Sequence, residues 1–312
     1  MEIKDILFDI VSPINALLII ILNFVEIFFI WKMKMVQRKR STVFILNLSI
    51  SDLILGLTII ISKILTFSTN SFAVKMNVFL RSSFIQVTLM VSVFTNLVLT
   101  TERLLAVKYP HLYRRMTKRQ RNYTCLAIWV CSFVFAGTRF AFQVRTSQSN
   151  AYYQQFIILS TIILASLPWP IISYTIVRRI ITQRFFTGKN QLERKASTFN
   201  DGQRFLTLCL RSFFIFVLCW IPYACFGYFI FFKRPQQDIN LFAIQYTVHL
   251  LAFVNSVLNP ILYLYTYNIG QSIKRHFVGQ KEAKLRSSVI INPRASTEMN
   301  ELSSPTSSNS TN

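Results

Sequence analysis

Five polar side chains interrupt otherwise apolar stretches, and their types suit the binding of a small cation or a proton. Asp52 stands inside NLSISDLILGL, Ser92 in a later apolar stretch, and Asn255, Ser256 and Asn259 in the last one. A carboxylate among hydroxyl and amide oxygens offers the hard ligands that small cations prefer. Within a membrane such groups are costly, so each is a functional hypothesis by default. The alternative is a hydrogen-bonded clamp between helices that holds no ligand.

A second group of residues has the chemistry of a conformational switch. Glu102 and Arg103 stand side by side where the apolar run TNLVLTT ends. Pro222 in CWIP and Pro260 in NPILY each remove one helical hydrogen bond, which frees a backbone carbonyl four residues earlier. Both helices are therefore expected to kink, and a kinked helix can swing as a hinge.

The elements that must position these side chains are membrane-spanning helices. Hydrophobic residues make up 52% of the 312 residues and charged residues 15%, and the mean hydropathy is +0.42, which is too apolar for an ordinary soluble domain. A span needs about 20 predominantly apolar residues. Backbone groups in lipid must be paired within the segment, which favours helices. Seven apolar blocks fit, at residues 12–31, 43–66, 83–107, 124–142, 155–177, 205–232 and 241–265.

This pattern predicts an all-α membrane protein, a seven-transmembrane helix bundle with a short amphipathic eighth helix. The segment NIGQSIKRHF repeats apolar residues every four positions with basic residues between them, as a helix in the membrane interface does. The chain end is rich in serine and threonine, a composition typical of disorder. The predicted parts are a short extracellular N-terminus (1–11), the transmembrane domain (12–267), the amphipathic helix (268–278) and the cytoplasmic tail (279–312).

The net charge of +22 indicates membrane topology and not nucleic-acid binding. Lysine and arginine follow the first, third, fifth and seventh blocks, whereas the opposite connections carry few. This positive-inside bias predicts a multi-pass membrane protein with its N-terminus outside and its C-terminus in the cytoplasm. The basic loops can also contact anionic membrane lipid. The absence of an internal repeat disfavours a transporter built from two related halves.

Together, these motifs resemble those of the rhodopsin-like (class A) family of G-protein-coupled receptors over residues 12–278. Asn23 matches the asparagine of the family's first helix and Trp129 the tryptophan of its fourth. The stretches NLSISD, TERLLAVKYP, CWIP and NPILY match motifs of the second, third, sixth and seventh helices, in that order. The resemblance implies a receptor, not an enzyme, that binds an extracellular ligand and activates a heterotrimeric G protein.

The resemblance also implies roles for the polar residues. The five residues introduced first would line a sodium pocket that favours the inactive state, with Asp52 as the charged ligand, and no other cofactor is expected. Glu102 would restrain Arg103 at rest and release it toward the G protein. Leu104 stands where the family's motif has tyrosine, and Val78 replaces a cysteine of the family's usual outer disulfide. The expected activation switch comprises Glu102, Arg103, Trp220, Pro222, Asn259, Pro260 and Tyr263.

The ligand pocket is expected between the outer ends of the helices, concave and mostly apolar. Lys63 and Arg81 favour a lipid or another acidic ligand, because a guanidinium pairs well with carboxylate or phosphate. Alternatively, these cations only reach toward the water interface. An amine or peptide receptor of the same family and, in another class, a seven-helix transporter or channel are the alternative functions. The candidate pocket residues are Lys63, Arg81, Ile85, Gln86, Trp220, Tyr223, Tyr246 and His249.

Two features lie apart from these roles. Glu26, one helical turn after Asn23, is unusual in mid-membrane, and the sequence assigns it no function. Phosphorylation of the tail serines by receptor kinases would add negative charge for arrestin capture. The alternative for the tail is a plain solvated segment.

Overall fold

The computed structural model of the chain describes residues 10–34, 41–145, 148–187, 214–233 and 239–266. These residues are almost entirely helical, and no strand occurs among them. They belong to one compact unit, Met1–Tyr263, except for the last residues of the final helix, which begin a second unit, Leu264–Asn312. The amphipathic helix predicted at 268–278, the tail predicted at 279–312 and most of the predicted N-terminus lie outside the described residues.

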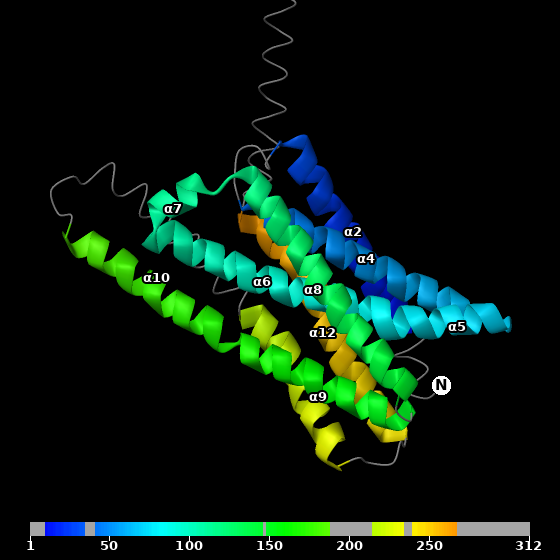
Figure 1. Cartoon of the computed structure of the whole chain (residues 1–312). Helices are drawn as coiled ribbons and strands as arrows, with labels where there is room; N and C mark the ends of the chain where they lie inside the picture. Colours follow the sequence, from blue (N-terminus) through cyan, green and yellow to red (C-terminus); the bar gives the residue numbers. More distant parts are fainter. Residues whose placement is uncertain (1–9, 35–40, 146–147, 188–213, 234–238, 267–312) are drawn as a thin grey trace, which may run out of the picture. The chain divides into compact units, whose positions relative to one another are not determined.

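α6 runs through the middle of the helices of the first unit (Figure 1). α6 contacts α4, α8 and α10, and α2 packs along α4. In chain order the helices are α2 (Ser12–Lys32), α4 (Thr42–Thr66), α5 (Ser71–Phe79), the π-helical segment η2 (Leu80–Phe84), α6 (Ile85–Lys108), α7 (Pro110–Arg115), α8 (Lys118–Arg145), α9 (Gln148–Ser166), α10 (Pro168–Thr187), the helix Phe214–Lys233 and α12 (Ile239–Thr266).

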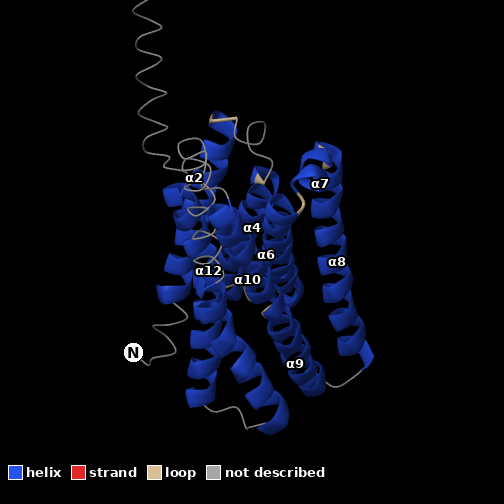
Figure 2. Cartoon of the chain, turned by 90° about the vertical axis from the view of Figure 1, so that its left-hand side faces the viewer, coloured by secondary structure: helices blue, strands red, loops and turns tan. Residues whose placement is uncertain are grey.

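The predicted all-α membrane bundle is confirmed. Six helical stretches of the described residues are long and apolar enough to cross a membrane, with Ile157–Gln183, which joins α9 to α10, counted as one of them. α8 is not among the six, and its two ends carry lysine and arginine. With α8 as the fourth, each of the seven predicted blocks contains a described helix. Figure 2 shows the described residues as helices joined by short loops or turns or by undescribed segments.

The structure corrects three of the predicted boundaries. Helical structure before the third span begins at Ser71 and runs through α5 and η2 into α6. The fifth span is interrupted at Leu167, because Pro168 lacks the N–H of a helical residue and disfavours helical geometry just before it. The stretch between the predicted blocks 124–142 and 155–177 is largely helical, because α8 and α9 extend into it from both sides. Hydropathy locates only the lipid-embedded part of a helix, so polar helix ends escape it.

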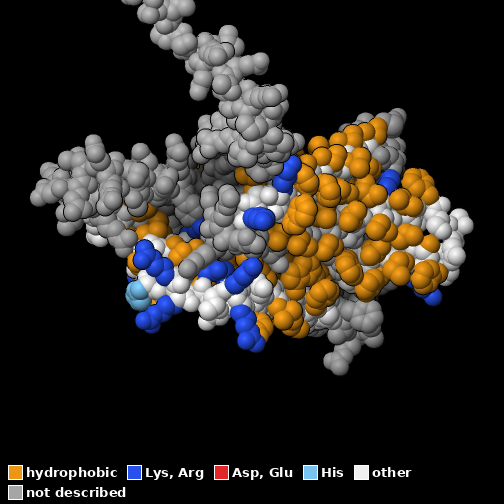
Figure 3. Space-filling model, turned by 90° about the horizontal axis from the view of Figure 1, so that it is seen from above, with side chains coloured by type: hydrophobic (Ala, Val, Ile, Leu, Met, Phe, Trp, Pro, Cys, Tyr) orange, Lys and Arg blue, Asp and Glu red, His pale blue; other side chains and the backbone are white. Residues whose placement is uncertain are grey.

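The outer surface of the helices is apolar, as a surface in contact with lipid must be. Ile14, Phe24, Ile64 and Leu126 are each more than half exposed. On the face drawn in Figure 3, hydrophobic side chains form a broad continuous area, and lysine and arginine gather to one side of it. We call the end of the bundle where α6 ends and α8 begins the basic end, and the opposite end the pocket end.

The tightest helix contact depends on Gly56 of α4. α2 turns one face toward the interior, with buried residues at helical spacing that include Ala16, Ile19 and Asn23. A Cβ atom on Gly56 would lie 2.8 Å from Ile20 Cγ1 and 3.1 Å from the carbonyl oxygen of Ala16. The missing side chain therefore lets the two backbones approach, as small residues do in membrane helix pairs.

We expect Gly56→Ala to lower the free energy of unfolding by about 1–3 kcal/mol, because the added methyl group must push α2 away from α4. Gly137→Ala is the matched control, since a Cβ on Gly137 of α8 meets no atom within 4 Å. That variant should be neutral or gain about 0.5–1 kcal/mol of helix propensity. Unfolding of the purified protein in detergent measures both, and equal effects of the two substitutions would contradict the close-packing explanation.

Candidate functional site

The buried carboxylate of Asp52 is the centre of a polar cluster contributed by three helices. Asp52 of α4 is fully buried. Its Oδ1 accepts a hydrogen bond of 3.0 Å from Ser92 Oγ of α6 and one of 2.8 Å from Ser256 Oγ of α12. The structure thus places three of the five residues of the expected cation pocket in direct contact. Helices far apart in sequence converge here because each turns its few polar residues away from the apolar exterior.

The remaining polar atoms around this cluster have unused hydrogen-bonding capacity. Within the described part of the chain, Asp52 Oδ2 and the side-chain amides of Asn255 and Asn259 are buried without a hydrogen-bond partner. Buried polar groups are normally paired, so such a set calls for a ligand or water. One carboxylate together with hydroxyl and amide oxygens is a ligand set for a small hard cation. No group of three or more His, Cys, Asp or Glu side chains that would suit a transition metal occurs among the described residues.

A backbone carbonyl that Pro260 leaves without a helical donor joins this cluster to α2. A proline at 260 cannot donate to the carbonyl of Ser256, one turn earlier in α12. Asn23 Nδ2 of α2 donates to that carbonyl at 3.0 Å and also to the Ile19 carbonyl at 2.8 Å. The backbone group released by the proline is therefore satisfied by a side chain from another helix. The freed carbonyl was predicted from the sequence, whereas its partner was not.

An aromatic series leads from the centre of the bundle toward the pocket end. Trp220 is almost fully buried, and its ring centroid lies 5.9 Å from those of Phe216 and Tyr223 on the same helix. The Tyr223 ring packs edge-on against His249 of α12 at 5.0 Å, and His249 lies 6.4 Å from Phe253. Ring contacts thus join the helix that contains Pro222 to the helix that contains Pro260.

A cavity of about 180 Å³ opens above this series at the pocket end. Of the eight candidate pocket residues, six line it, Trp220 is not among the lining residues, and the Arg81 side chain lies outside the described residues. Ser12, Ser62 and Leu159 also line the cavity and were missed from the sequence, because their residue types do not distinguish them from other residues of the same helices. The residues that line it are Ser12, Ile59, Ser62, Lys63, Ile85, Gln86, Leu89, Leu159, Tyr223, Gln245, Tyr246, His249 and Phe253.

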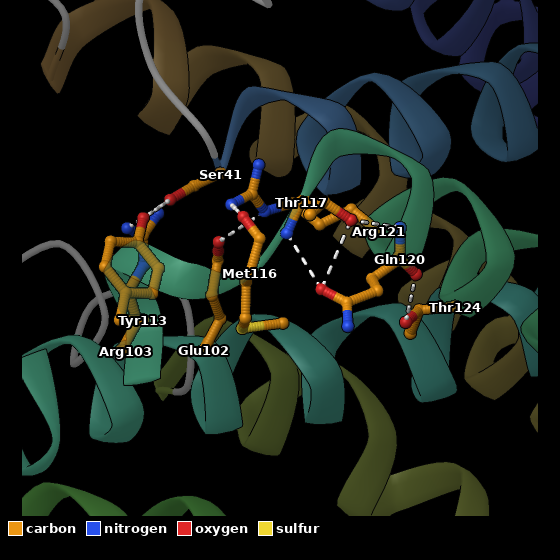
Figure 4. A network of polar contacts seen from close by, with 9 residues as sticks. All are labelled: Ser41, Glu102, Arg103, Tyr113, Met116, Thr117, Gln120, Arg121 and Thr124. Atoms are coloured by element: carbon orange, nitrogen blue, oxygen red, sulfur yellow. Dashed lines mark hydrogen bonds and ion pairs between the residues drawn. The ribbon is translucent and has the colours of Figure 1, made fainter. Parts of the chain in front are cut away.

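At the basic end, Glu102 and Arg103 contact different partners (Figure 4). Arg103 Nη1 donates to Ser41 Oγ of the residue before α4 at 2.7 Å. The carboxylate of Glu102 faces Arg121 of α8, with 3.8 Å between Oε1 and Arg121 Nε. The expected restraint of Arg103 by Glu102 is therefore corrected to an ion pair between Glu102 and Arg121. Adjacent residues on a helix point in different directions, so neighbours in sequence do not face each other.

The Glu102–Arg121 pair also holds the connection between α7 and α8. Arg121 Nη2 donates to the Met116 carbonyl at 2.8 Å, so one guanidinium joins α6 to this connection (Figure 4). Both charged side chains are almost completely buried, at 2% and 4% exposure. The sequence places Arg121 among several basic residues of one loop, and only its burial distinguishes it from them. Ser41 was also missed, because only its position in the folded structure distinguishes it from other serines.

The chain is similar in sequence to a family of membrane receptors and to several of its members. The family described as 7 transmembrane receptor (rhodopsin family) matches residues 22–263. An adenosine receptor A3 of Bos taurus is 25% identical over 260 residues, which cover 76% of this chain and 79% of that protein. A neuropeptide S receptor of Macaca mulatta is 24% identical over 267 residues, covering 77% and 71%. A galanin receptor 2a of Danio rerio is 23% identical over 238 residues, covering 72% and 65%.

Proposed function

We propose that this chain, which belongs to the rhodopsin family of seven-transmembrane receptors, binds an extracellular ligand in the cavity at its pocket end and thereby activates a heterotrimeric G protein. The family consists of receptors, which are not enzymes. The match to a receptor family leaves a transporter or channel without support. The observation that carries the proposal is the series of ring contacts that leads from His249 and Tyr223 at the cavity to buried Trp220. The Asp52 cluster is joined through Ser256 to α12, the helix that also carries His249.

The ligand that we favour is a small molecule with an acidic group. Lys63, whose ammonium lies over the Phe67 ring, lines the cavity. Polar residues such as Gln86, Gln245 and His249 share the wall with apolar ones such as Ile59 and Leu89. Such a wall suits a ligand with one charged end and an apolar body. The relatives named above are receptors for adenosine, galanin and neuropeptide S, which gives a nucleoside or peptide ligand as the second candidate and lends no support to a lipid in particular.

In the membrane we place the basic end in the cytoplasm. The chain is a multi-pass membrane protein, and cytoplasmic loops of such proteins carry an excess of lysine and arginine. The N-terminus and the cavity would then face the outside of the plasma membrane, and α7 would face the G protein. Anionic lipid at the inner surface, and receptor kinases and arrestin at the tail, are further proposed partners.

Activation is proposed to shift an equilibrium between a resting and a signalling arrangement of the helices. A sodium ion held by Asp52, Ser92, Asn255, Ser256 and Asn259 would supply positive charge that favours the resting arrangement. Ligand contact with Tyr223 and His249 would move the Trp220 ring, and Pro222 would let the helix Phe214–Lys233 swing. Asn259, Pro260 and Tyr263 would transmit the change along α12. At the basic end, Arg103 would leave Ser41 and meet the G protein.

The test is a G-protein activation screen of the receptor with libraries of acidic, nucleoside, peptide and amine compounds. For an acidic activator we expect Lys63→Gln to lower potency about tenfold to a hundredfold, because a charge-assisted hydrogen bond contributes about 1.5–3 kcal/mol. Lys75→Gln, an exposed position on α5 outside the cavity, is the matched control. Equal potency on both variants would exclude Lys63 as the acid's partner, and activation only by nucleosides or peptides would establish the second candidate.

A further inference from the structure

Glu26 is a buried acid to which neither the ligand cavity nor the switch gives a role. It lies in the middle of α2, on the face that includes Ala16, Ile19 and Asn23, and only 3% of its surface is exposed. This face packs against α4, the helix that also carries Asp52. An acid in this position is costly unless something compensates its charge, so its surroundings decide in which form it exists.

Among the residues that the structure describes, no cation compensates Glu26. Within the described part of the chain it forms no ion pair with lysine, arginine or histidine. The charged group that acts on it from α4 is Asp52, an acid that would repel a second negative charge. From α12, the residues that lie opposite Asn23, one turn earlier on α2, include Ser256, which does not titrate. A carboxylate here would be an unpaired charge in the interior, the arrangement that buried groups avoid.

The contacts of Ser49 also favour the neutral form of Glu26. Ser49 Oγ of α4 lies 2.8 Å from Glu26 Oε2 and 2.9 Å from the Ile45 carbonyl oxygen. A serine hydroxyl has one proton, and a carboxylate and a carbonyl are both only acceptors. Both contacts become full hydrogen bonds if Glu26 is a carboxylic acid, because its O–H then donates to Ser49 while Ser49 donates to Ile45.

From this geometry we propose that Glu26 is a proton-binding site, in which a neutral carboxylic acid donates to Ser49 and fastens α2 to α4. The site is distinct from the Asp52 cluster but communicates with it. One turn earlier on α2, Asn23 donates to the Ser256 carbonyl, and Ser256 Oγ donates to Asp52. Loss of the proton would leave one Ser49 hydroxyl to be shared between the Glu26 carboxylate and the Ile45 carbonyl. It would also leave an uncompensated charge between α2 and α4, which loosens this joint and favours the signalling arrangement. This last step rests on the proposed function, whereas the proton site itself does not.

The proton is detected directly by infrared spectroscopy of the full-length receptor in lipid nanodiscs. We expect the wild-type receptor to show a carbonyl-stretch band of a protonated carboxylic acid that shifts in deuterated water and is lost in Glu26→Gln. Asp52→Asn is the matched control and must leave this component in place. Ser49→Ala should shift the band, because the acid loses its acceptor, and this variant keeps the test open if Glu26→Gln does not fold. A spectrum that is the same in wild type, Glu26→Gln and Ser49→Ala would overturn the proposal.

The link to signalling is tested by basal G-protein activation as the pH is raised. We expect the wild-type signal to rise as the Glu26 band declines, and the signal of Glu26→Gln to stay constant. An equal pH response in both proteins, or a constant signal in both, would overturn the link. If no G protein is activated under any condition while the band still depends on Glu26, the proton site stands and the proposed function fails.

Discussion

Replacing Arg121 by leucine is expected to lower the free energy of unfolding by about 3–5 kcal/mol, because it leaves the buried carboxylate of Glu102 without its cation. The guanidinium of Arg121 lies 3.8 Å from that carboxylate, and neither oxygen of Glu102 has a hydrogen bond among the described residues. The same substitution also removes the bond from Arg121 to the Met116 carbonyl, which holds the α7–α8 connection. Thermal or denaturant unfolding of the purified receptor measures the loss.

Two variants separate the ion pair from ordinary packing. The double variant Glu102→Gln, Arg121→Leu should recover much of the stability, since removing both charges leaves no unpaired ion. Arg119→Leu, two residues away on the exposed face of α8, should change stability by no more than about 0.5 kcal/mol. If Arg119→Leu and Arg121→Leu cost the same, or if the double variant is as unstable as Arg121→Leu alone, the buried pair does not stabilise the fold.

The pair also predicts a change in signalling. Glu102→Gln weakens the hold of α6 on the α7–α8 connection, so basal activation of the G protein should rise without any ligand. The increase should arise through Arg121 and the connection, because the Arg103 bond to Ser41 involves no atom of Glu102. Nucleotide exchange on the G protein, with equal amounts of each receptor, measures the baseline. A baseline equal to that of wild type would show that this ion pair has no part in the switch.

The second large effect concerns sodium. At a sodium concentration 100-fold above its dissociation constant, the wild-type receptor should gain about 2.7 kcal/mol in stability, because an ion that binds the folded state alone stabilises it by mass action. Asp52→Asn should abolish this gain, since it removes the charged ligand among Ser92, Ser256 and the two unpaired asparagine amides. The comparison uses unfolding temperatures in sodium chloride and in N-methylglucamine chloride at equal ionic strength, which keeps charge screening constant.

An equal response of wild type and Asp52→Asn to sodium would contradict the cation site. Ser92→Ala gives an intermediate case, because it removes one hydroxyl but leaves the carboxylate. It should weaken sodium binding without abolishing it. A cluster that only clamps helices together would behave differently: Asp52→Asn would lower stability by the same amount in both salts.

Some contacts follow from the sequence because they depend on neighbouring residues alone. The freed carbonyl before Pro260 is one, since proline lacks an N–H wherever it stands. The helix interruption at Leu167 also follows from a local rule, because it immediately precedes Pro168. Hydropathy alone does not indicate it, since the break lies within one apolar block. The partner of that freed carbonyl, Asn23 of α2, lies more than 200 residues away in the chain, and no local rule indicates it.

By itself, the sequence determined that the chain is a bundle of membrane helices in the rhodopsin family, because hydropathy and motif order are local properties that add up along the chain. Only the tertiary structure decided which side chains meet. Glu102 pairs with Arg121 and not with adjacent Arg103, and Glu26 meets Ser49. Successive helical residues point roughly 100° apart, so these pairings depend on how each helix is rotated toward its neighbours. That rotation results from packing of whole helices, such as α2 against Gly56 of α4.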